Sequence, residues 1–252
     1  MNNPKDYWQD KTNSGHRFSS TEYFRKKALE CAQVMEEFGS TGEIIDLGCG
    51  AGELLEQLIP LARISKGIDY SPSMIESAKQ RLKDIDIDLD VADIFEILPQ
   101  SSFPTWTTTE ALNQYLNPTE MARVIGLFAR NEQAHAFYLF DCVDPIRYMT
   151  LGMGSYYSTQ PESALNGLTA RTKSIARDLI SCAKLASFRL GRQQWIKWKD
   201  QGMGFAYTPY FWFETCKKLN LEINFISSKY YEYRYHAIIR KLPRADSRAQ
   251  NF

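Results

Sequence analysis

The stretch Ile44–Gly52, which reads IIDLGCGAG, decides the fold of this chain. It begins with a β-branched pair typical of a strand, continues through three alternating glycines, and leads into the helix-forming run Glu53–Leu58. Glycine is favoured at such a turn because the chain must reverse sharply and bring its backbone close to a ligand. The pattern therefore predicts a strand, a glycine turn and a helix, with a ligand at the turn.

The residue after the last glycine indicates which class of ligand the turn accepts. A dinucleotide fingerprint reads G-x-G-x-x-G, and Glu53 stands here where its third glycine would be. A carboxylate in the first helical turn would also repel a pyrophosphate at the helix N-terminus. We therefore expect a cofactor that carries positive charge and no phosphate, and a dehydrogenase ranks last among the interpretations.

Several segments, in order along residues 43–144, resemble the motifs of the class I S-adenosylmethionine-dependent methyltransferases. An ordered series of this kind is a stronger signal than one glycine motif. The resemblance implies S-adenosyl-L-methionine as the cofactor. The segments are Asp46–Gly52, Gly67–Ser71, Val91–Ile94, Thr107–Asn113 and Phe137–Asp141.

The resemblance also implies which residues bind the cofactor. Gly48 and Gly50 would contact it through their backbone, Asp69 would accept hydrogen bonds from the ribose hydroxyls, and Asp93 would meet the adenine amine. Without a cofactor, Asp69 would only cap the next helix and Asp93 would be a solvated loop acid. The complete predicted set is Tyr7, Arg17, Asp46, Gly48, Gly50, Asp69, Tyr70, Met74, Asp93, Ile94 and Thr109.

The catalytic base is harder to assign. Methyl transfer from a sulfonium requires alignment, exclusion of water and, for a hydroxyl or ammonium acceptor, removal of a proton. The base should lie at the carboxyl ends of the strands, whereas His135 opens its strand at the opposite end and His236 lies inside the last strand. The unranked candidates are His16, Glu110, Asp141 and Asp144.

The resemblance implies an α/β fold with a Rossmann-like, doubly wound, mostly parallel seven-stranded sheet and a last antiparallel strand. Ile85–Val91 alternates strictly, as expected of an edge strand with solvated acids, whereas Ala134–Phe140 is almost wholly apolar and suits a central strand. No metal site is expected. The predicted parts are an N-terminal lid and helix (1–40), a methyltransferase core (41–149 and 206–243), a helical insertion after strand five that caps the acceptor (150–205), and a tail (244–252).

The predicted insertion is locally basic. Residues 171–199 contain eight basic residues and a single acid, Asp178. A basic amphipathic helix followed by Trp195 and Trp198 would bind an anionic or phosphorylated acceptor, or contact a membrane peripherally through residues 168–199. The plain alternative is a solvated helix. The aromatic run Tyr230–His236 weakly resembles methyltransferases of bacterial surface glycans, which implies a glycan-like acceptor.

Composition limits the remaining possibilities. The 252 residues have a formal net charge of zero and a pI of about 6.8, so no overall field attracts nucleic acid or a bilayer. Five dispersed cysteines, a polar N-terminus and the lack of a long apolar run favour a soluble, cytoplasmic protein.

We therefore expect a methyltransferase acting on a small-molecule or glycan-like acceptor, at oxygen, in a biosynthetic pathway. One alternative is an N-methyltransferase or a nucleic-acid methyltransferase, although an N-P-P-Y-type motif is absent after the fourth predicted strand. The other alternative is a non-catalytic regulator that binds S-adenosylmethionine. The oligomeric state is left open.

Overall fold

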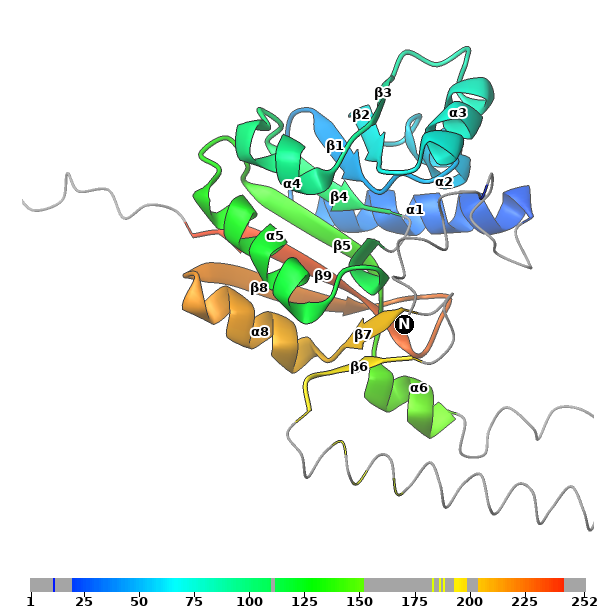
Figure 1. Cartoon of the computed structure of the whole chain (residues 1–252). Coiled ribbons are helices and arrows are strands. Elements are labelled where there is room, and N and C mark those ends of the chain that lie inside the picture. Colours follow the sequence, from blue (N-terminus) through cyan, green and yellow to red (C-terminus); the bar gives the residue numbers. More distant parts are fainter. Residues whose placement is uncertain are drawn as a thin grey trace, which may run out of the picture.

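The computed structural model describes residues 11, 20–109, 112–151, 183, 186, 188, 193–198 and 204–242. These residues form a seven-stranded sheet with helices on both faces, and a separate two-stranded sheet (Figure 1). The main sheet has the strand order β3-β2-β1-β4-β5-β9-β8. Its strands are β1 (Ile44–Leu47), β2 (Ile64–Asp69), β3 (Asp88–Val91), β4 (Thr105–Thr108), β5 (Ala136–Val143), β8 (Leu221–Ser227) and β9 (Arg234–Lys241).

The pairing directions confirm the predicted fold class. Strands β1 to β5 pair in parallel, and β9 runs antiparallel to both β5 and β8. β3 is an edge strand, as its alternating pattern predicts, and all eight residues of β5 are buried, as expected of a central strand. The arrangement is a Rossmann-like, doubly wound sheet with one antiparallel strand.

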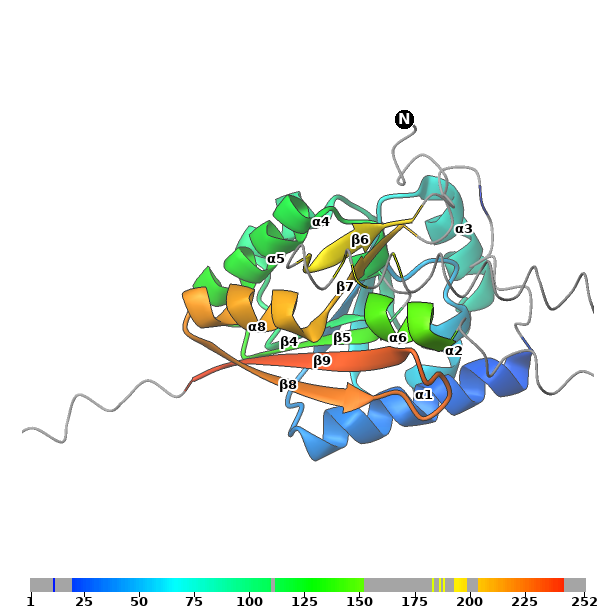
Figure 2. The ribbon, with the colours of Figure 1, turned by 90° about the horizontal axis from the view of Figure 1, so that it is seen from below.

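Helices cover the two faces of the sheet as two separate apolar layers. One layer packs α1, α2 and α3 against the sheet, and the other packs α5 and α8 with α4 at its edge. Figure 2 shows α4, α5 and α8 on one side of the strands and α1 on the other. The helices are α1 (Thr21–Glu37), α2 (Glu53–Leu58), α3 (Pro72–Arg81), α4 (Ile94–Ile97), α5 (Pro118–Arg130), α6 (Pro145–Leu151) and α8 (Pro209–Lys218), with short 3₁₀ helices η2 (Leu98–Gln100) and η3 (Leu112–Gln114).

The sequence predicts helix starts at Ser71-Pro72 and Thr208-Pro209, because each pair places a capping hydroxyl before a proline, and the structure confirms both. The Ser71 hydroxyl accepts a hydrogen bond from the backbone N–H of Met74, and Pro72 occupies the first turn of α3. The Thr208 side chain caps α8 in the same way, with Pro209 at the helix start. Hydroxyl caps satisfy N–H groups that a helix leaves unpaired, and proline lacks the N–H that would otherwise need a partner.

A β-bulge near the carboxyl end of β5 changes the predicted course of this strand. Leu139 pairs with Ala237 and Cys142 with Tyr235, so one extra residue lies in β5. Asp141 occupies this region in a left-handed conformation, with φ of 55°. A bulge breaks the alternation of side chains, so the Asp141 carboxylate faces α1, as Phe140 does. β5 also extends to Val143, beyond the predicted end.

The predicted insertion lies largely outside the described residues, and so does its predicted helix. Its described end contains an unpredicted hairpin, in which β6 (Trp195–Lys197) pairs antiparallel with β7 (Phe205–Tyr207). The strand predicted from Ile85 begins later, at Asp88. The sequence also predicts a closing antiparallel strand pair over Glu222–Ser227 and Tyr233–Lys241. The structure confirms this pair as β8 and β9, with the start of each strand shifted by one residue.

Candidate active site

The glycine turn lies at the carboxyl edge of the sheet, where the strand order reverses (Figure 1). β1 pairs with β2 on one side and with β4 on the other, so the crossovers that follow β1 and β3 lead in opposite directions. In open parallel sheets a ligand binds in the crevice beyond this switch point. The predicted site residues must therefore meet at the ends of β1, β2 and β4.

The three glycines of the turn adopt conformations that favour glycine. The φ angles of Gly48, Gly50 and Gly52 are 71°, 59° and 77°. The Gly48 N–H donates to the carbonyl of Ile68 over 2.8 Å, which joins the turn to β2. A β-carbon at Gly48 would lie 3.1 Å from Cβ of Leu112. Glycine is thus required here by both backbone conformation and close packing.

The carboxylate of Asp69 connects the glycine turn to the end of β2. Its Oδ2 accepts a hydrogen bond from the Gly50 N–H over 3.1 Å, and its Oδ1 accepts one from the Ser71 N–H over 2.9 Å. The N-cap of α3 is Ser71, so Asp69 is not the helix cap that it would be without a cofactor. The Asp69 side chain is buried and held in one orientation beside the turn.

A second carboxylate, that of Glu53, borders the turn and affects which class of cofactor can bind there. Glu53 is buried in the first turn of α2, and its nearest cation is the Arg81 guanidinium, with an Nη2–Oε1 distance of 3.9 Å. Arg81 also donates from Nε to the carbonyl of Ala51 over 3.1 Å. The carboxylates of Asp69 and Glu53, both buried beside the turn, disfavour a pyrophosphate at this helix N-terminus and suit a cationic, phosphate-free group.

Asp46 has a structural role that its motif does not indicate. Its carboxylate, which is fully buried, accepts hydrogen bonds from the Thr107 hydroxyl over 2.7 Å, from the Thr109 N–H over 3.0 Å and from the Thr109 hydroxyl over 2.6 Å. These contacts join the end of β1 to the end of β4. Thr109, which the resemblance implies is a cofactor-binding residue, is therefore fixed by Asp46.

The segments predicted to hold the ribose and adenine lie together at the ends of β2 and β3. The Ala92 N–H donates to the Asp69 carbonyl over 2.9 Å, which joins the two ends. Tyr70 follows Asp69 and is half-buried, and Met74 on α3 is almost fully buried. The structure thus brings these predicted residues to the same edge as the glycine turn.

Asp93 and Ile94 start α4 at this edge. The Asp93 carboxylate accepts a hydrogen bond from the Phe95 N–H over 2.8 Å and is the N-cap of the helix. Ile94 is buried, whereas Asp93 is exposed. Asp93 is therefore accessible to a ligand. Its exposure and its bond to the Phe95 N–H also agree with the alternative that it is a solvated loop acid, which here caps α4.

The two described candidate bases are engaged with other groups. Asp144 caps α6, because its Oδ1 accepts from the N–H groups of Ile146 (2.9 Å) and Arg147 (3.3 Å). Asp141 lies 2.8 Å from Nζ of Lys27 and is buried. Four other predicted site residues, Tyr7, His16, Arg17 and Glu110, lie outside the described residues.

Asp141 belongs to a buried ion cluster that sequence reasoning missed. The Arg234 guanidinium lies 3.5 Å from the same carboxylate oxygen as Lys27, and the Asp141 N–H donates to Nδ1 of His236 over 3.2 Å. Burial alone would raise the pKa of Asp141, but the charges of Lys27 and Arg234 outweigh burial and hold that pKa well below its usual range. An acid that stays ionised in this way is a poor acceptor of a substrate proton.

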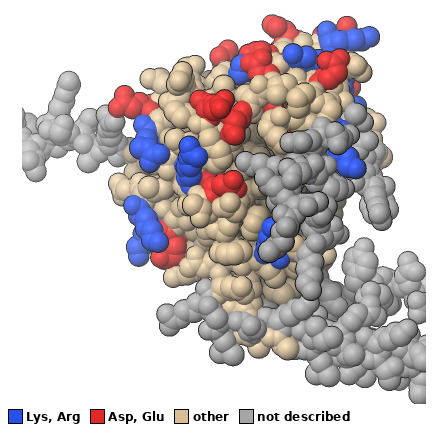
Figure 3. Space-filling view, viewed as in Figure 1, with Lys and Arg blue, Asp and Glu red and all other residues tan. Residues whose placement is uncertain are grey.

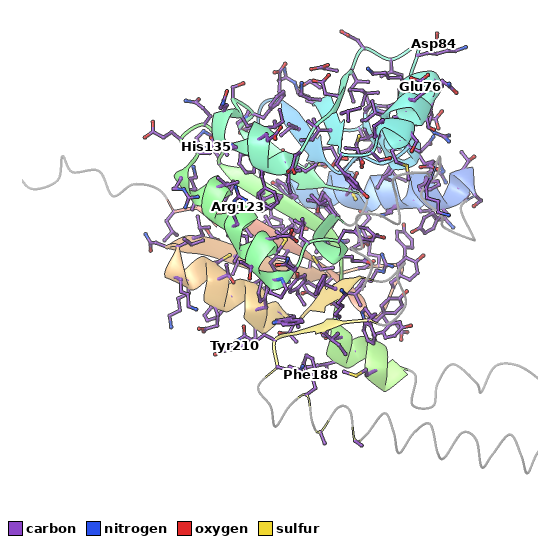
Figure 4. The ribbon with its side chains drawn as sticks, viewed as in Figure 1. Glu76, Asp84, Arg123, His135, Phe188 and Tyr210 are labelled. Atoms are coloured by element: carbon purple, nitrogen blue, oxygen red, sulfur yellow. The ribbon has the colours of Figure 1, made fainter. Side chains whose placement is uncertain are left out.

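The histidines lie as the sequence indicates. The backbone N–H of His135 donates to the Pro104 carbonyl at the amino end of β5, and Figure 4 shows His135 at the opposite end of the sheet from α6. His236 is buried inside β9, with Nε2 3.3 Å from Oε1 of Glu30. His135 is therefore at the wrong end of the sheet to act as the base, and His236 is engaged in structural contacts.

The described part of the chain shows neither a metal cluster nor a membrane span. Within it, no group of three or more histidine, cysteine, aspartate or glutamate side chains could hold a metal ion. No helix among the same residues is long and apolar enough to cross a bilayer. On the face seen in Figure 3, basic and acidic side chains are intermingled over the described surface.

The family comparison agrees with the site geometry. Residues 39–147 match the model of a methyltransferase domain. An uncharacterized methyltransferase of Schizosaccharomyces pombe is 34% identical over 77 residues, which are 31% of this chain and 28% of that protein. A putative methyltransferase of Geobacillus sp. (strain WCH70) is 27% identical over 140 residues, 54% of each chain. The chain thus spans between 28% and 54% of the length of these curated relatives.

Solved structures share the fold at low sequence identity. Magnesium protoporphyrin IX methyltransferase from Synechocystis PCC 6803, with bound S-adenosylmethionine, has a TM-score of 0.54 and 12% identity, covering 96% of this chain and 99% of that chain. The N-methyltransferase NodS from Bradyrhizobium japonicum WM9, in complex with S-adenosyl-L-homocysteine, has a TM-score of 0.54 and 15% identity, covering 96% and 100%. At these identities the likeness shows the fold alone.

Proposed function

We propose that this chain, whose residues 39–147 form a methyltransferase domain of the class I S-adenosylmethionine-dependent type, transfers a methyl group to a small-molecule or glycan-like acceptor, at oxygen. The observation that carries the proposal is the hydrogen bond of 3.1 Å between the Gly50 N–H and the Asp69 carboxylate. It joins a glycine turn that lets a ligand approach the backbone to an acid suited to ribose hydroxyls, at the switch point of the sheet.

The residues of this edge have the chemistry that such a donor requires. Asp69 would accept the ribose hydroxyls, Met74 and Ile94 would enclose the adenine ring, and Gly48 and Gly50 would offer backbone groups. When bound, S-adenosylmethionine supplies a methyl group that its sulfonium already activates for displacement. The protein then has to align the acceptor and exclude water.

Proton removal is the remaining requirement for a hydroxyl acceptor. Because Asp141 is held ionised by two cations and Asp144 caps α6, we favour Glu110 or His16 for this task. An N–H acceptor would need the same step from its ammonium form. A nucleic-acid acceptor is disfavoured by the zero formal net charge of the chain and by the lack of an N-P-P-Y-type motif after the fourth strand.

The cofactor assignment is tested by calorimetry with S-adenosylmethionine, S-adenosylhomocysteine and NAD. We expect micromolar binding of the first two and no binding of NAD. Asp69→Ala should weaken S-adenosylhomocysteine binding by ~2–4 kcal/mol, because two hydroxyls would lose a charged acceptor. Asp84→Ala, on the exposed turn after α3 labelled in Figure 4, is the matched control and should bind like the wild type.

Two outcomes would overturn the assignment. Binding of NAD without a response to S-adenosylhomocysteine would indicate a dinucleotide site despite Glu53. An Asp69→Ala variant with wild-type affinity would mean that Asp69 only orders the turn between Gly50 and Ser71.

The acceptor is tested by incubation of the protein with a cell extract and S-adenosylmethionine carrying a ¹³C-labelled methyl group. The ¹³C chemical shift of the labelled product distinguishes an O-methyl from an N-methyl group, and mass spectrometry identifies the product. A labelled N-methyl product would replace oxygen by nitrogen as the accepting atom. Binding of the donor without any labelled product would favour the non-catalytic regulator.

A further inference from the structure

A buried ion cluster that the proposed function does not use lies between α1 and the carboxyl end of β5. Its members are Lys27 and Glu30 on α1, Asp141 in the bulge of β5, and Arg234 and His236 on β9. The Arg234 side chain is 15% exposed, and the other four are 5% exposed or less. Burial of five ionisable side chains costs desolvation free energy, so we examined what these side chains hold in place.

Lys27 is the member of the cluster that touches the candidate site. Its Nζ lies 2.8 Å from Oδ2 of Asp141 and donates to the Thr109 carbonyl over 3.2 Å. The N–H and hydroxyl of Thr109 are already bound by Asp46 from the end of β1. One ammonium group therefore joins α1 to the ends of β4 and β5, and through Thr109 to β1.

Asp141 is presented to Lys27 by an unusual backbone conformation. A non-glycine residue with a φ of 55° is uncommon and persists only where the surroundings hold it in place. β9 supplies two of these contacts, from Arg234 to the carboxylate (3.5 Å) and from the Asp141 N–H to Nδ1 of His236 (3.2 Å). Since Nδ1 accepts a hydrogen bond, the proton of a neutral His236 lies on Nε2, which faces Glu30.

We propose that Lys27 is a positioning residue for the methyl donor. By holding the Thr109 carbonyl and the Asp141 carboxylate on one ammonium group, it fixes the end of β4 against which the sulfonium end of the donor binds. This inference rests on the proposed function, since it needs a donor at that edge. Glu30 and His236 form the far half of the cluster. Glu30 holds Ser228 and Lys229 in the turn between β8 and β9, and in the described part of the chain neither Glu30 nor His236 hydrogen-bonds to Thr109.

The test separates positioning from stability. Lys27→Met alone would leave Asp141 buried with Arg234 as its remaining close cation and is expected to destabilise the fold. The double variant Lys27→Met/Asp141→Asn removes one charge of each sign and leaves Arg234 and Glu30 in the cluster, so its net charge is unchanged. Replacement of a buried ion pair by neutral groups of similar size is often neutral for stability. Glu30→Gln is the matched control, because it changes a buried acid one turn away on the same helix face.

We expect the double variant to unfold near the wild-type urea midpoint but to bind S-adenosylhomocysteine at least about tenfold more weakly in calorimetry. Glu30→Gln, measured under conditions where it is folded, should bind within about twofold of the wild type. Hydrogen exchange should show that S-adenosylhomocysteine protects residues 107–114 in the wild type and in Glu30→Gln, and protects them less in the double variant.

Each other outcome counts against a defined claim. A double variant with wild-type affinity and wild-type protection of residues 107–114 overturns the positioning role and leaves the proposed function intact. An equal loss of affinity in Glu30→Gln assigns the cluster to the general structure of the sheet and also overturns it. A wild-type protein that does not bind S-adenosylhomocysteine overturns the proposed function, and this inference with it.

Discussion

The carboxylate of Asp46 at the end of β1 binds both the backbone N–H and the hydroxyl of Thr109 at the end of β4, over 3.0 and 2.6 Å. Asp46 is fully buried, so these bonds and that from Thr107 replace the water that an ionised carboxylate would otherwise keep. The acid of the glycine motif therefore serves the protein by holding two neighbouring strand ends together. Any effect of Asp46 on the donor would then act at least partly through the position of Thr109.

Asp46→Asn should lower the free energy of unfolding by ~1–3 kcal/mol, because a neutral amide replaces the charge-assisted hydrogen bonds from Thr107 and Thr109 with weaker ones. Urea unfolding monitored by tryptophan fluorescence measures the change. Asp88→Asn is the control, since its side chain is 60% exposed and pairs with Lys66 at the sheet edge. The control should change stability by less than about 0.5 kcal/mol. Equal effects of the two substitutions would contradict the structural role of Asp46.

The ion pair of Asp141 predicts a specific loss of stability in acid. The pKa of Asp141 lies well below its usual range when the protein is folded and near about 3.9 when it is unfolded. The unfolded state therefore binds the proton first, and the contribution of Asp141 is complete above that value and is lost as the pH falls towards the folded-state pKa. Burial opposes this downward shift of the pKa, and the charges of Lys27, Arg234 and His236 cause it.

The acid effect is measured by urea unfolding of the wild type and of Lys27→Met/Asp141→Asn between about pH 2 and pH 6. The wild type should lose stability more steeply than the variant below about pH 4, because only the wild type carries this ionised carboxylate. Parallel curves for the two proteins over the whole range would show that the pair does not govern acid stability.

Local sequence patterns predicted the character of two strands, whereas the resemblance to a family implied the order and direction of the sheet. The alternation in residues 85–91 predicted an edge strand and the apolar run in residues 134–140 a central one, because burial on one or two faces directly selects side chains. Ser71 and Thr208 marked helix starts for an equally local reason, since a cap bonds to N–H groups within three residues.

The ion cluster could not be predicted in this way. Lys27 and Thr109 are 82 positions apart, and only the packing of α1 under the sheet brings them together. No glycine marks the bulge at Asp141, because ion pairs and a hydrogen bond to His236 hold the backbone there. The periodicity of α1 likewise suggested a helix with an apolar face and did not indicate that two of its charged residues are buried.

The basic segment of residues 171–199 remains a prediction about the acceptor. Replacement of Arg171, Lys173 and Arg177 by glutamine should raise the KM for an anionic acceptor, more at low salt than at high salt, since exposed charges are screened by salt. Affinity for S-adenosylhomocysteine should stay near the wild type. Steady-state kinetics at two ionic strengths, with the acceptor identified by methyl labelling, measure both effects. Unchanged turnover at both would indicate a solvated helix and an uncharged acceptor.

A comparison of Gly48 with Gly39 tests whether the glycine turn allows a ligand to approach the backbone closely. Both have positive φ, 71° and 66°, so an alanine at either position carries a similar backbone cost, on the order of 1 kcal/mol. They differ in their surroundings. A β-carbon at Gly39 would meet nothing within 4 Å, whereas one at Gly48 would lie 3.1 Å from Cβ and 3.2 Å from Cδ1 of Leu112.

Gly48→Ala should therefore cost ~1–3 kcal/mol more than Gly39→Ala in urea unfolding, because η3 must shift to admit the methyl group. It should also weaken S-adenosylhomocysteine binding about tenfold, since the glycine turn belongs to the proposed donor site, whereas Gly39→Ala should bind like the wild type. Calorimetry on the folded variants provides the second measurement. If both variants lose the same stability and keep full affinity, only the backbone conformation at Gly48 requires glycine, and the turn does not closely contact a donor.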